Sequence, residues 1–326
     1  MKSKWQGFQS SIAAPIERYL AQKRALGCRF RTEERALRLL DRFLVAQEIK
    51  TIKEIQPKLI ETFLASRPRA RPRSYNHLLG TMRRLFDWLV AQGDLPCSPV
   101  RIRPRRETAQ RVPFLFNAEQ ARQLLAAAAR LPDRPKGPLR GLTYRTMFAL
   151  LGLRVGEVVR LRGGDVDLGR RLLIIRDTKF SKSRLVPFGP RLGQLLDDYL
   201  ARHAQHYGPL SAEALVFSFN AGKPISLTTM GQTLRRLFAQ LDLPIPPGAS
   251  RPRVHDLRHS FAVGTLLRWY REGLDPSARL LHLATFLGHA DPASTAVYLT
   301  ITSELLAQAS RRFERFAGEK LREVLA

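Results

Sequence analysis

The 326-residue chain has only two cysteines, Cys28 and Cys97, so a framework of disulfide bonds and a cysteine-ligated metal site are both excluded. No apolar run reaches the roughly 18 residues that a membrane span requires. The first ten residues, MKSKWQGFQS, lack the apolar core of a signal peptide. Internal repeats are also absent. We therefore expect a cytoplasmic protein, and the length suits two domains because single cores rarely grow past about 250–300 residues.

Acidic residues are scarce, and this is the first strong indication of function. The chain has 28 acidic residues against 55 basic ones, a net charge of +27, and 44 of the basic residues are arginine. Residues 1–110 contain 23 basic and 10 acidic residues, so the excess is not confined to a tail. A GC-rich genome would explain arginine in place of lysine but not the net charge. A polyanion partner, double-stranded DNA above all, explains it because basic residues release the counterions condensed on phosphates.

Two arginine-rich stretches, RPRARPR (67–73) and RIRPRR (101–106), lie in expected loops. They supply the candidate DNA-binding residues of the N-terminal part, which are Arg69, Arg71, Arg73, Arg101, Arg103 and Arg105. Most of the 44 arginines would contact phosphate, so the sequence does not single out the residues that read bases.

Apolar residues spaced by three and four predict a helical N-terminal domain over residues 1–104. Its expected helices are 16–26, 33–47, 58–66 and 74–93, the last ending at Gly93. Residues 95–113 contain four prolines and no period, which is typical of a linker between domains.

The remainder, 114–326, is expected to be mainly helical with a small antiparallel sheet. Asn117 and Gln120 form a capping-box pattern before a helix over 118–130, and 171–188 has the alternation of a β-hairpin. The other expected helices are 143–151, 190–205, 228–241, 255–271, 277–287 and 292–299. An amphipathic helix is predicted over 303–326.

The segment FLGHADPASTAVYLT (286–300) predicts a sharp corner between two helices. Gly288 can end a helix in the left-handed conformation, and Asp291 and Pro292 are typical of the N-cap and first residue of the next helix. His289 would then lie in the corner and Tyr298 on the second helix. Three further segments contain arginine, lysine or histidine residues that could act with His289 and Tyr298: GLRVGEVVRL (152–161), DTKFSKSRLVPF (177–188) and HDLRHSFA (255–262).

In order and spacing, these four segments resemble the tyrosine recombinases of the phage integrase and Xer type. That family has an arginine in a GLR-x-x-E turn, a lysine in a β-hairpin, an H-x-x-R motif, and a G-H followed nine residues later by a tyrosine. The corresponding residues here are Arg154, Lys179, His255, Arg258, His289 and Tyr298. A lone H-x-x-R arises by chance among 44 arginines, so the combination of motifs, rather than any single one, carries the resemblance.

The resemblance spans nearly the whole chain and implies an N-terminal helical core-binding domain followed by a catalytic domain. It departs from the family pattern at Gly156, where serine is frequent, and at Phe180, where glycine is frequent. Lys182 lies close enough in sequence to compete with Lys179 for the same role, and we also count it among the candidate DNA-binding residues.

The residue types suit transfer of a phosphodiester. Arg154 and Arg258 offer planar forks of donors for the non-bridging oxygens, and His289 offers a further hydrogen bond. His255 is suited to proton transfer or to a phosphate contact. Lys179 is the candidate general acid for the leaving 5′ oxygen.

The resemblance implies that Tyr298 attacks and forms a covalent 3′-phosphotyrosine. Glu157 is expected to orient a guanidinium or a histidine of the site without contacting the DNA itself. His259 is expected to have a similar supporting role or to serve in packing. Because the adduct keeps the phosphoester bond energy, no cofactor or metal is expected, in keeping with the lack of a P-loop, of paired acidic metal ligands and of Cys/His clusters.

The predicted function is therefore a site-specific DNA recombinase that works as a homotetramer on two DNA sites, with related partner recombinases as an open possibility. The C-terminal helix is expected to dock on a neighbouring protomer, the alternative being packing on its own domain. Two other functions remain open at this point: a type IB topoisomerase-like enzyme, and a DNA-binding accessory protein without catalysis.

Overall fold

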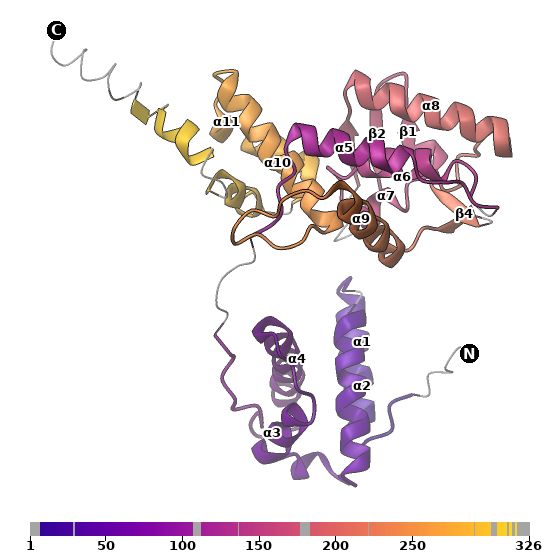
Figure 1. Ribbon diagram of the computed structural model, residues 1–326. Helices are drawn as coiled ribbons and strands as arrows, with labels where there is room; N and C mark the ends of the chain where they lie inside the picture. Colours follow the sequence, from indigo (N-terminus) through magenta and orange to yellow (C-terminus); the bar gives the residue numbers. More distant parts are fainter. Residues whose placement is uncertain are drawn as a thin grey trace. The chain divides into compact units, whose positions relative to one another are not determined.

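The chain forms two compact units, residues 1–110 and 111–326, which we call unit 1 and unit 2 and describe separately (Figure 1). Their boundary falls inside the stretch 95–113, for which the sequence predicts a linker. The computed structural model describes residues 7–28, 30–106, 112–135, 137–176, 183–220, 222–289, 291–300, 305–311, 313–314 and 317.

Unit 1 is a small helical domain. Its helices are α1 (Ala13–Ala25), α2 (Arg31–Ala46), the short 3-10 helix η1 (Ile52–Glu54), α3 (Pro57–Ala65) and α4 (Pro72–Ala91). Their apolar faces meet in one core that includes Tyr19, Leu37, Phe63 and Met82. The start of α1 is fixed by Asp41 of α2, whose buried carboxylate accepts hydrogen bonds from the backbone N–H groups of Gln9 and Ser10.

The chain that follows α4 packs back onto unit 1, although it has no helix or strand. Leu95 and Val100 are buried in the core of unit 1. The side chain of Asn76 accepts from the backbone N–H of Arg105 at 2.8 Å and donates to its carbonyl at 2.7 Å. These contacts position the arginine-rich stretch 101–106 against α4.

Unit 2 is mostly helical. Its helices are α5 (Ala118–Ala129), α6 (Arg140–Ala149), α7 (Val155–Val158), η2 (Gly163–Asp165), α8 (Pro190–Tyr207), α9 (Leu227–Leu241), α10 (Val254–Arg271), α11 (Pro276–Leu287), α12 (Ala293–Ala296) and η4 (Val297–Thr300). Helices α5 and α6 approach closely, because a Cβ on Gly141 would lie 2.2 Å from the carbonyl oxygen of Ala129. Asn117 caps α5 through the expected capping box with Gln120.

Two small antiparallel sheets complete unit 2. The first has the order β1 (Val166–Asp167), β2 (Leu172–Ile175) and β3 (Arg184–Pro187), and the second pairs β4 (Ser218–Asn220) with β5 (Lys223–Pro224). The register pairs Leu173 with Val186 and Ile175 with Arg184. The sequence-based expectation of a mainly helical protein with a small antiparallel sheet is thus confirmed, and β1 is a strand that the hairpin pattern did not reveal.

The core of unit 2 has two parts. The larger cluster lies among α5 to α9 and the sheet, and includes Phe114, Tyr144 and Phe217. A smaller cluster lies between α10, α11 and η4, which occupy one end of unit 2 (Figure 1), and it includes Leu266 and Leu287.

The helix predicted over 292–299 is wrong in detail. The structure has one short turn, α12, followed by the 3-10 helix η4 that carries Tyr298. Of the helix predicted over 303–326, residues 305–311 are helical and Leu305 is buried in the smaller cluster, while most of the rest lies outside the described residues. Among the described helices, none has the length and apolarity that crossing a membrane requires.

Candidate active site

The loop before α7 positions Arg154 and Glu157 against each other. Arg154 is the extended N-cap residue of α7, and Glu157 is the third residue of the helix. Glu157 Oε2 accepts the backbone N–H of Arg154 at 3.0 Å, and Oε1 accepts Arg154 Nη1 at 2.9 Å. A carboxylate at this position of a helix start satisfies a backbone donor that the helix itself leaves free.

A second arginine, Arg184 at the start of β3, completes the environment of Glu157. Its Nη1 and Nη2 atoms donate to Oε1 at 3.1 Å and to Oε2 at 2.9 Å. Burial raises the pKa of Glu157, but the hydrogen bonds from Arg184 and Arg154 outweigh burial and leave that pKa below its ordinary value. Glu157 is therefore a buried anion between two guanidinium groups. The sequence analysis did not single out Arg184, since nothing local distinguishes it from other arginines.

The end of α11 is the second organising element. Gly288 takes the left-handed conformation with φ 65°, as the sequence predicts. A Cβ at Gly288 would lie 2.6 Å from Cζ of Arg184, so glycine is required for space as well as for conformation. The last carbonyls of the helix then point at arginines: Arg184 Nε donates to Phe286 O at 3.1 Å, and Arg154 Nη2 to Gly288 O at 2.6 Å.

Arg258 of α10 is the third guanidinium at this helix end and is only 1% exposed. It donates to the carbonyls of Gly152, at 3.0 Å, and Leu287. Within the described residues it makes no ion pair with a carboxylate. Burial lowers its pKa to about 10, and the neighbouring charge of Arg154 acts in the same direction. A buried cation without an anionic partner is costly, so this position favours a negatively charged ligand.

Tyr298 lies next to this cluster. Its ring is 5% exposed and packs with Val263, Leu266 and Leu287, but its hydroxyl lies 2.9 Å from Nδ1 of His259. The ring is thus in apolar surroundings, while the oxygen faces polar groups. Burial raises the pKa of Tyr298, although the charges of Arg258 and Arg154 oppose the shift.

His289 is held at the corner by Thr295 of α12. Its Nδ1 lies 2.7 Å from Oγ1 of Thr295, a side chain with no solvent exposure, and its ring is parallel to that of Tyr298 with centroids 6.4 Å apart. Partial burial lowers the pKa of His289 to about 4, and the charges of Arg258 and Arg154 add to the effect. The imidazole is therefore neutral at pH 7.

His255 lies one turn before His259 on α10, where part of its side chain reaches solvent while protein atoms crowd the ring. Its ring meets that of His259 edge-on, with centroids 4.7 Å apart. Its pKa is lowered to about 4, mainly by desolvation and then by the charges of His259 and Arg258. Like His289, it is neutral at pH 7.

Seven of the residues predicted from sequence thus gather at one place in unit 2: Arg154, Glu157, His255, Arg258, His259, His289 and Tyr298. Lys179 and Lys182 lie outside the described residues. The sequence analysis missed Arg184 and Thr295. A signal for Thr295 existed, since it lies six residues after His289 and three before Tyr298 in the sequence.

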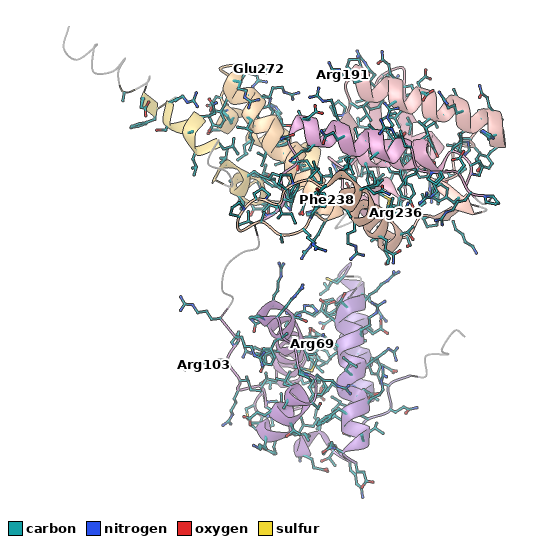
Figure 2. All side chains as sticks on the ribbon, in the orientation of Figure 1. Arg69, Arg103, Arg191, Arg236, Phe238 and Glu272 are labelled. Atoms are coloured by element: carbon teal, nitrogen blue, oxygen red, sulfur yellow. The ribbon has the colours of Figure 1, made fainter. Side chains whose placement is uncertain are left out.

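The candidate DNA-binding arginines all belong to unit 1, and Figure 2 labels two of them, Arg69 and Arg103. The guanidinium of Arg105 lies 3.9 Å above the ring of Tyr75 and donates to the carbonyl of Arg69 at 3.0 Å, so the two arginine-rich stretches are neighbours in space. The remaining four are exposed: Arg71, Arg73, Arg101 and Arg103.

Among the described residues, no group of three or more histidine, cysteine or acidic side chains is arranged to hold a metal ion. The site is built from guanidinium, imidazole, phenol, hydroxyl and carboxylate groups.

Comparisons with known proteins show which family the chain resembles. Residues 115–304 match the model of the phage integrase family. The putative integrase/recombinase y4rB of Sinorhizobium fredii is 35% identical over 319 residues, which cover 94% of this chain and 98% of that relative.

Solved structures share the fold. A crystal structure of the XerH site-specific recombinase bound to palindromic difH substrate has a TM-score of 0.61 at 19% identity and covers 86% of this chain and 78% of XerH. A lambda integrase dimer bound to a COC′ core site has a TM-score of 0.60 at 18% identity and covers 87% of this chain and 76% of that integrase.

Proposed function

The chain belongs to the phage integrase family of tyrosine recombinases, which act on DNA, and we propose that it cuts and rejoins DNA strands through a covalent 3′-phosphotyrosine at Tyr298. The observation that supports this assignment is the buried guanidinium of Arg258, which has no ion pair with a carboxylate among the described residues and lies near enough to the buried Tyr298 for their charges to interact. A phosphodiester supplies the anion that Arg258 lacks within the described residues, and it brings the atom that Tyr298 attacks.

The arginines retain capacity for a phosphate. A guanidinium has five N–H donors, and the side chains of Arg154 and Arg258 each use two of them on protein oxygens in the described structure. The guanidinium groups of Arg154, Arg184 and Arg258 meet at the end of α11, and the carboxylate of Glu157 neutralises one of their three charges. The site therefore keeps a net positive charge that stabilises the negative charge spreading over the non-bridging oxygens in the transition state.

His289 serves as a neutral hydrogen-bond donor to the same phosphate. When the hydroxyl of Thr295 donates to Nδ1 of His289, the ring proton is left on Nε2, where it is available to a phosphate oxygen. The low pKa of His289 keeps the ring neutral through the whole physiological range.

Lys179 remains our candidate for the general acid that protonates the leaving 5′ oxygen, with Lys182 as its competitor. The described chain resumes one residue after Lys182 and reaches Arg184, which binds Glu157. In the sequence, both lysines therefore come within five residues of an arginine that belongs to the site.

We further propose that DNA is held by both units and that four protomers act on two DNA sites in the cytoplasm, with a C-terminal helix exchanged between neighbours. The lambda integrase was crystallised as a dimer on a core site and XerH on its difH substrate, which supports assembly on DNA. The exposed arginines of unit 1 supply phosphate contacts. Related partner recombinases are compatible with this arrangement.

The test uses a duplex selected from a random-sequence pool by binding to the full chain, then nicked so that cleavage traps the covalent product. The wild-type protein should give a protein–DNA band that survives denaturation. The Tyr298→Phe variant should bind the same duplex and give no such band. A covalent band of equal yield with Tyr298→Phe removes Tyr298 from the reaction, and relaxation of a supercoiled plasmid without exchange between two sites would favour a topoisomerase.

A further inference from the structure

The hydroxyl of Tyr298 has one hydrogen-bond partner among the described residues, and it is a histidine that the family resemblance places only in a supporting role. Nδ1 of His259 lies 2.9 Å from the phenolic oxygen, within hydrogen-bond distance. The two rings have centroids 5.5 Å apart and are tilted by 56°. The residue expected to react and a group able to take its proton are therefore already in contact.

The phenol requires such a partner. A free tyrosine has a pKa near 10, and burial raises the pKa of Tyr298 further despite the charges of Arg258 and Arg154. Only a small fraction would be ionised at neutral pH, so the proton must leave as the oxygen attacks phosphorus.

The other two histidines are placed for different tasks. Nδ1 of His289 is occupied by Thr295, and its ring lies parallel to that of Tyr298. His255 lies on the first turn of α10 and meets His259 edge-on. Within the described residues, neither ring has a hydrogen bond to the phenol.

We propose that His259, rather than His255, accepts the proton of the Tyr298 hydroxyl during strand cleavage, an inference that rests on the proposed role of Tyr298 as nucleophile. The O–H bond of Tyr298 breaks and its proton moves to Nδ1 of His259. The phenolic oxygen forms a bond to phosphorus, and the bond between phosphorus and the 5′ oxygen breaks. The leaving oxygen is protonated by the general acid. In the rejoining step the protonated His259 returns the proton to the departing phenol.

The surroundings of His259 suit a base that is neutral before the reaction and positively charged once it has accepted the proton. The titratable and charged groups that face it are His255, Asp256 and Arg258 on α10, Tyr298 on η4, and His289 at the corner. Burial lowers the pKa of His259, the carboxylate of Asp256 raises it, and Arg258 lowers it, with a net lowering. The ring is thus ready to accept a proton at pH 7, and Asp256 stabilises the imidazolium that forms.

The His259→Asn variant tests this role, because the asparagine side chain places an amide near the position of Nδ1 but does not accept a proton. The matched control is His255→Asn on the preceding turn of the same helix. The measurement is the single-turnover rate of covalent complex formation on the nicked duplex from pH 5 to pH 9.5. The protein concentration is chosen so that DNA binding is faster than cleavage and the measured rate is that of the chemical step. For the wild type we expect a plateau at neutral pH and a decline in acid as His259 is protonated.

For His259→Asn we expect a rate about 10²–10⁴-fold lower at pH 7. We also expect that rate to rise tenfold per pH unit up to pH 9.5, because solvent must now ionise a phenol of raised pKa. His255→Asn should keep a plateau at neutral pH, whatever its amplitude. A residue that only orients the phenol would lower the rate without creating this slope.

The proposal is overturned if His259→Asn keeps the wild-type plateau, or if the rising slope is found in His255→Asn instead. Binding of the duplex and thermal unfolding establish that each variant is folded, and His259→Gln provides a second amide if asparagine prevents folding. The proposed function fails separately, when Tyr298→Phe still forms the covalent complex.

Discussion

The Glu157→Gln variant tests whether one buried carboxylate holds the arginines of the site in place. Each oxygen of Glu157 accepts two hydrogen bonds: Oε1 from the side chains of Arg154 and Arg184, and Oε2 from Arg184 and the backbone N–H of Arg154. In glutamine one of these oxygens becomes an NH₂ group, which faces two donors whichever way the amide turns. The Glu157 side chain is 2% exposed, so water does not replace the lost acceptor.

The expected cost follows from the burial of the ion pairs. Removing one partner of a buried ion pair costs about 3–5 kcal/mol, and in a unit of this size each kcal/mol lowers the unfolding temperature by roughly 2–4 °C. We therefore expect unit 2 to unfold roughly 6–20 °C lower in Glu157→Gln, with unit 1 as an unchanged internal reference. Differential scanning calorimetry of the full chain measures both transitions. A unit 2 transition within about 2 °C of the wild type would refute the reasoning.

The pH dependence provides a second readout of the same carboxylate. Its pKa is held below the ordinary value by Arg184 and Arg154. A lowered pKa in the folded state contributes stability that is present above the ordinary glutamate value of about 4.3 and is lost as the pH falls through the folded value. The difference in unfolding temperature between wild type and Glu157→Gln should therefore be constant near neutral pH and shrink below about pH 4.

Three further changes probe the same assembly, each measured by single-turnover cleavage of the nicked duplex and by thermal unfolding. Arg184→Lys keeps the charge but loses the two parallel hydrogen bonds to the carboxylate of Glu157, so both the cleavage rate and the stability should fall. Arg170→Lys, at a side chain that is 82% exposed, should change neither. Gly288→Ala should cost about 1–2 kcal/mol for the left-handed conformation alone, and it should slow cleavage because the new Cβ displaces Arg184. Thr295→Val leaves Nδ1 of His289 without its partner and should cost about 1–3 kcal/mol, while Thr295→Ser should retain most of the cleavage rate; equal rates for Val and Ser would contradict the role given to this hydrogen bond.

Much of the fold could be predicted from signals in short stretches of the sequence. The capping box at Asn117 and the helix end at Gly288 are written in neighbouring residues, and both were predicted from the sequence. The short turn α12 and the 3-10 helix η4 were not, because the packing of Tyr298 against α10 and α11 decides that geometry rather than its own sequence period.

The site was predictable as a set of residues but not as a network. The spacing of motifs singled out Arg258 and Tyr298 as candidates, yet it gave no indication that Arg258 is buried or that the phenol lies against His259. Arg184 was hidden among 44 arginines, since its partner Glu157 is 27 residues away in sequence and the carbonyl of Phe286 is 102 away. Interactions at such separations leave no local period for a sequence pattern to detect.

The end of α11 explains how three guanidinium groups can share one small volume. Helix C-termini carry a partial negative charge from carbonyls that the helix leaves unpaired, and here the carbonyls of Phe286, Leu287 and Gly288 receive Arg184, Arg258 and Arg154 in turn. These dipoles and Glu157 offset the repulsion among the cations, but dipoles add no net charge, so two positive charges stay uncancelled. A phosphate bound as we propose would meet donors that are already fixed by protein oxygens and need little rearrangement, which is the condition under which electrostatic stabilisation of a transition state is most effective.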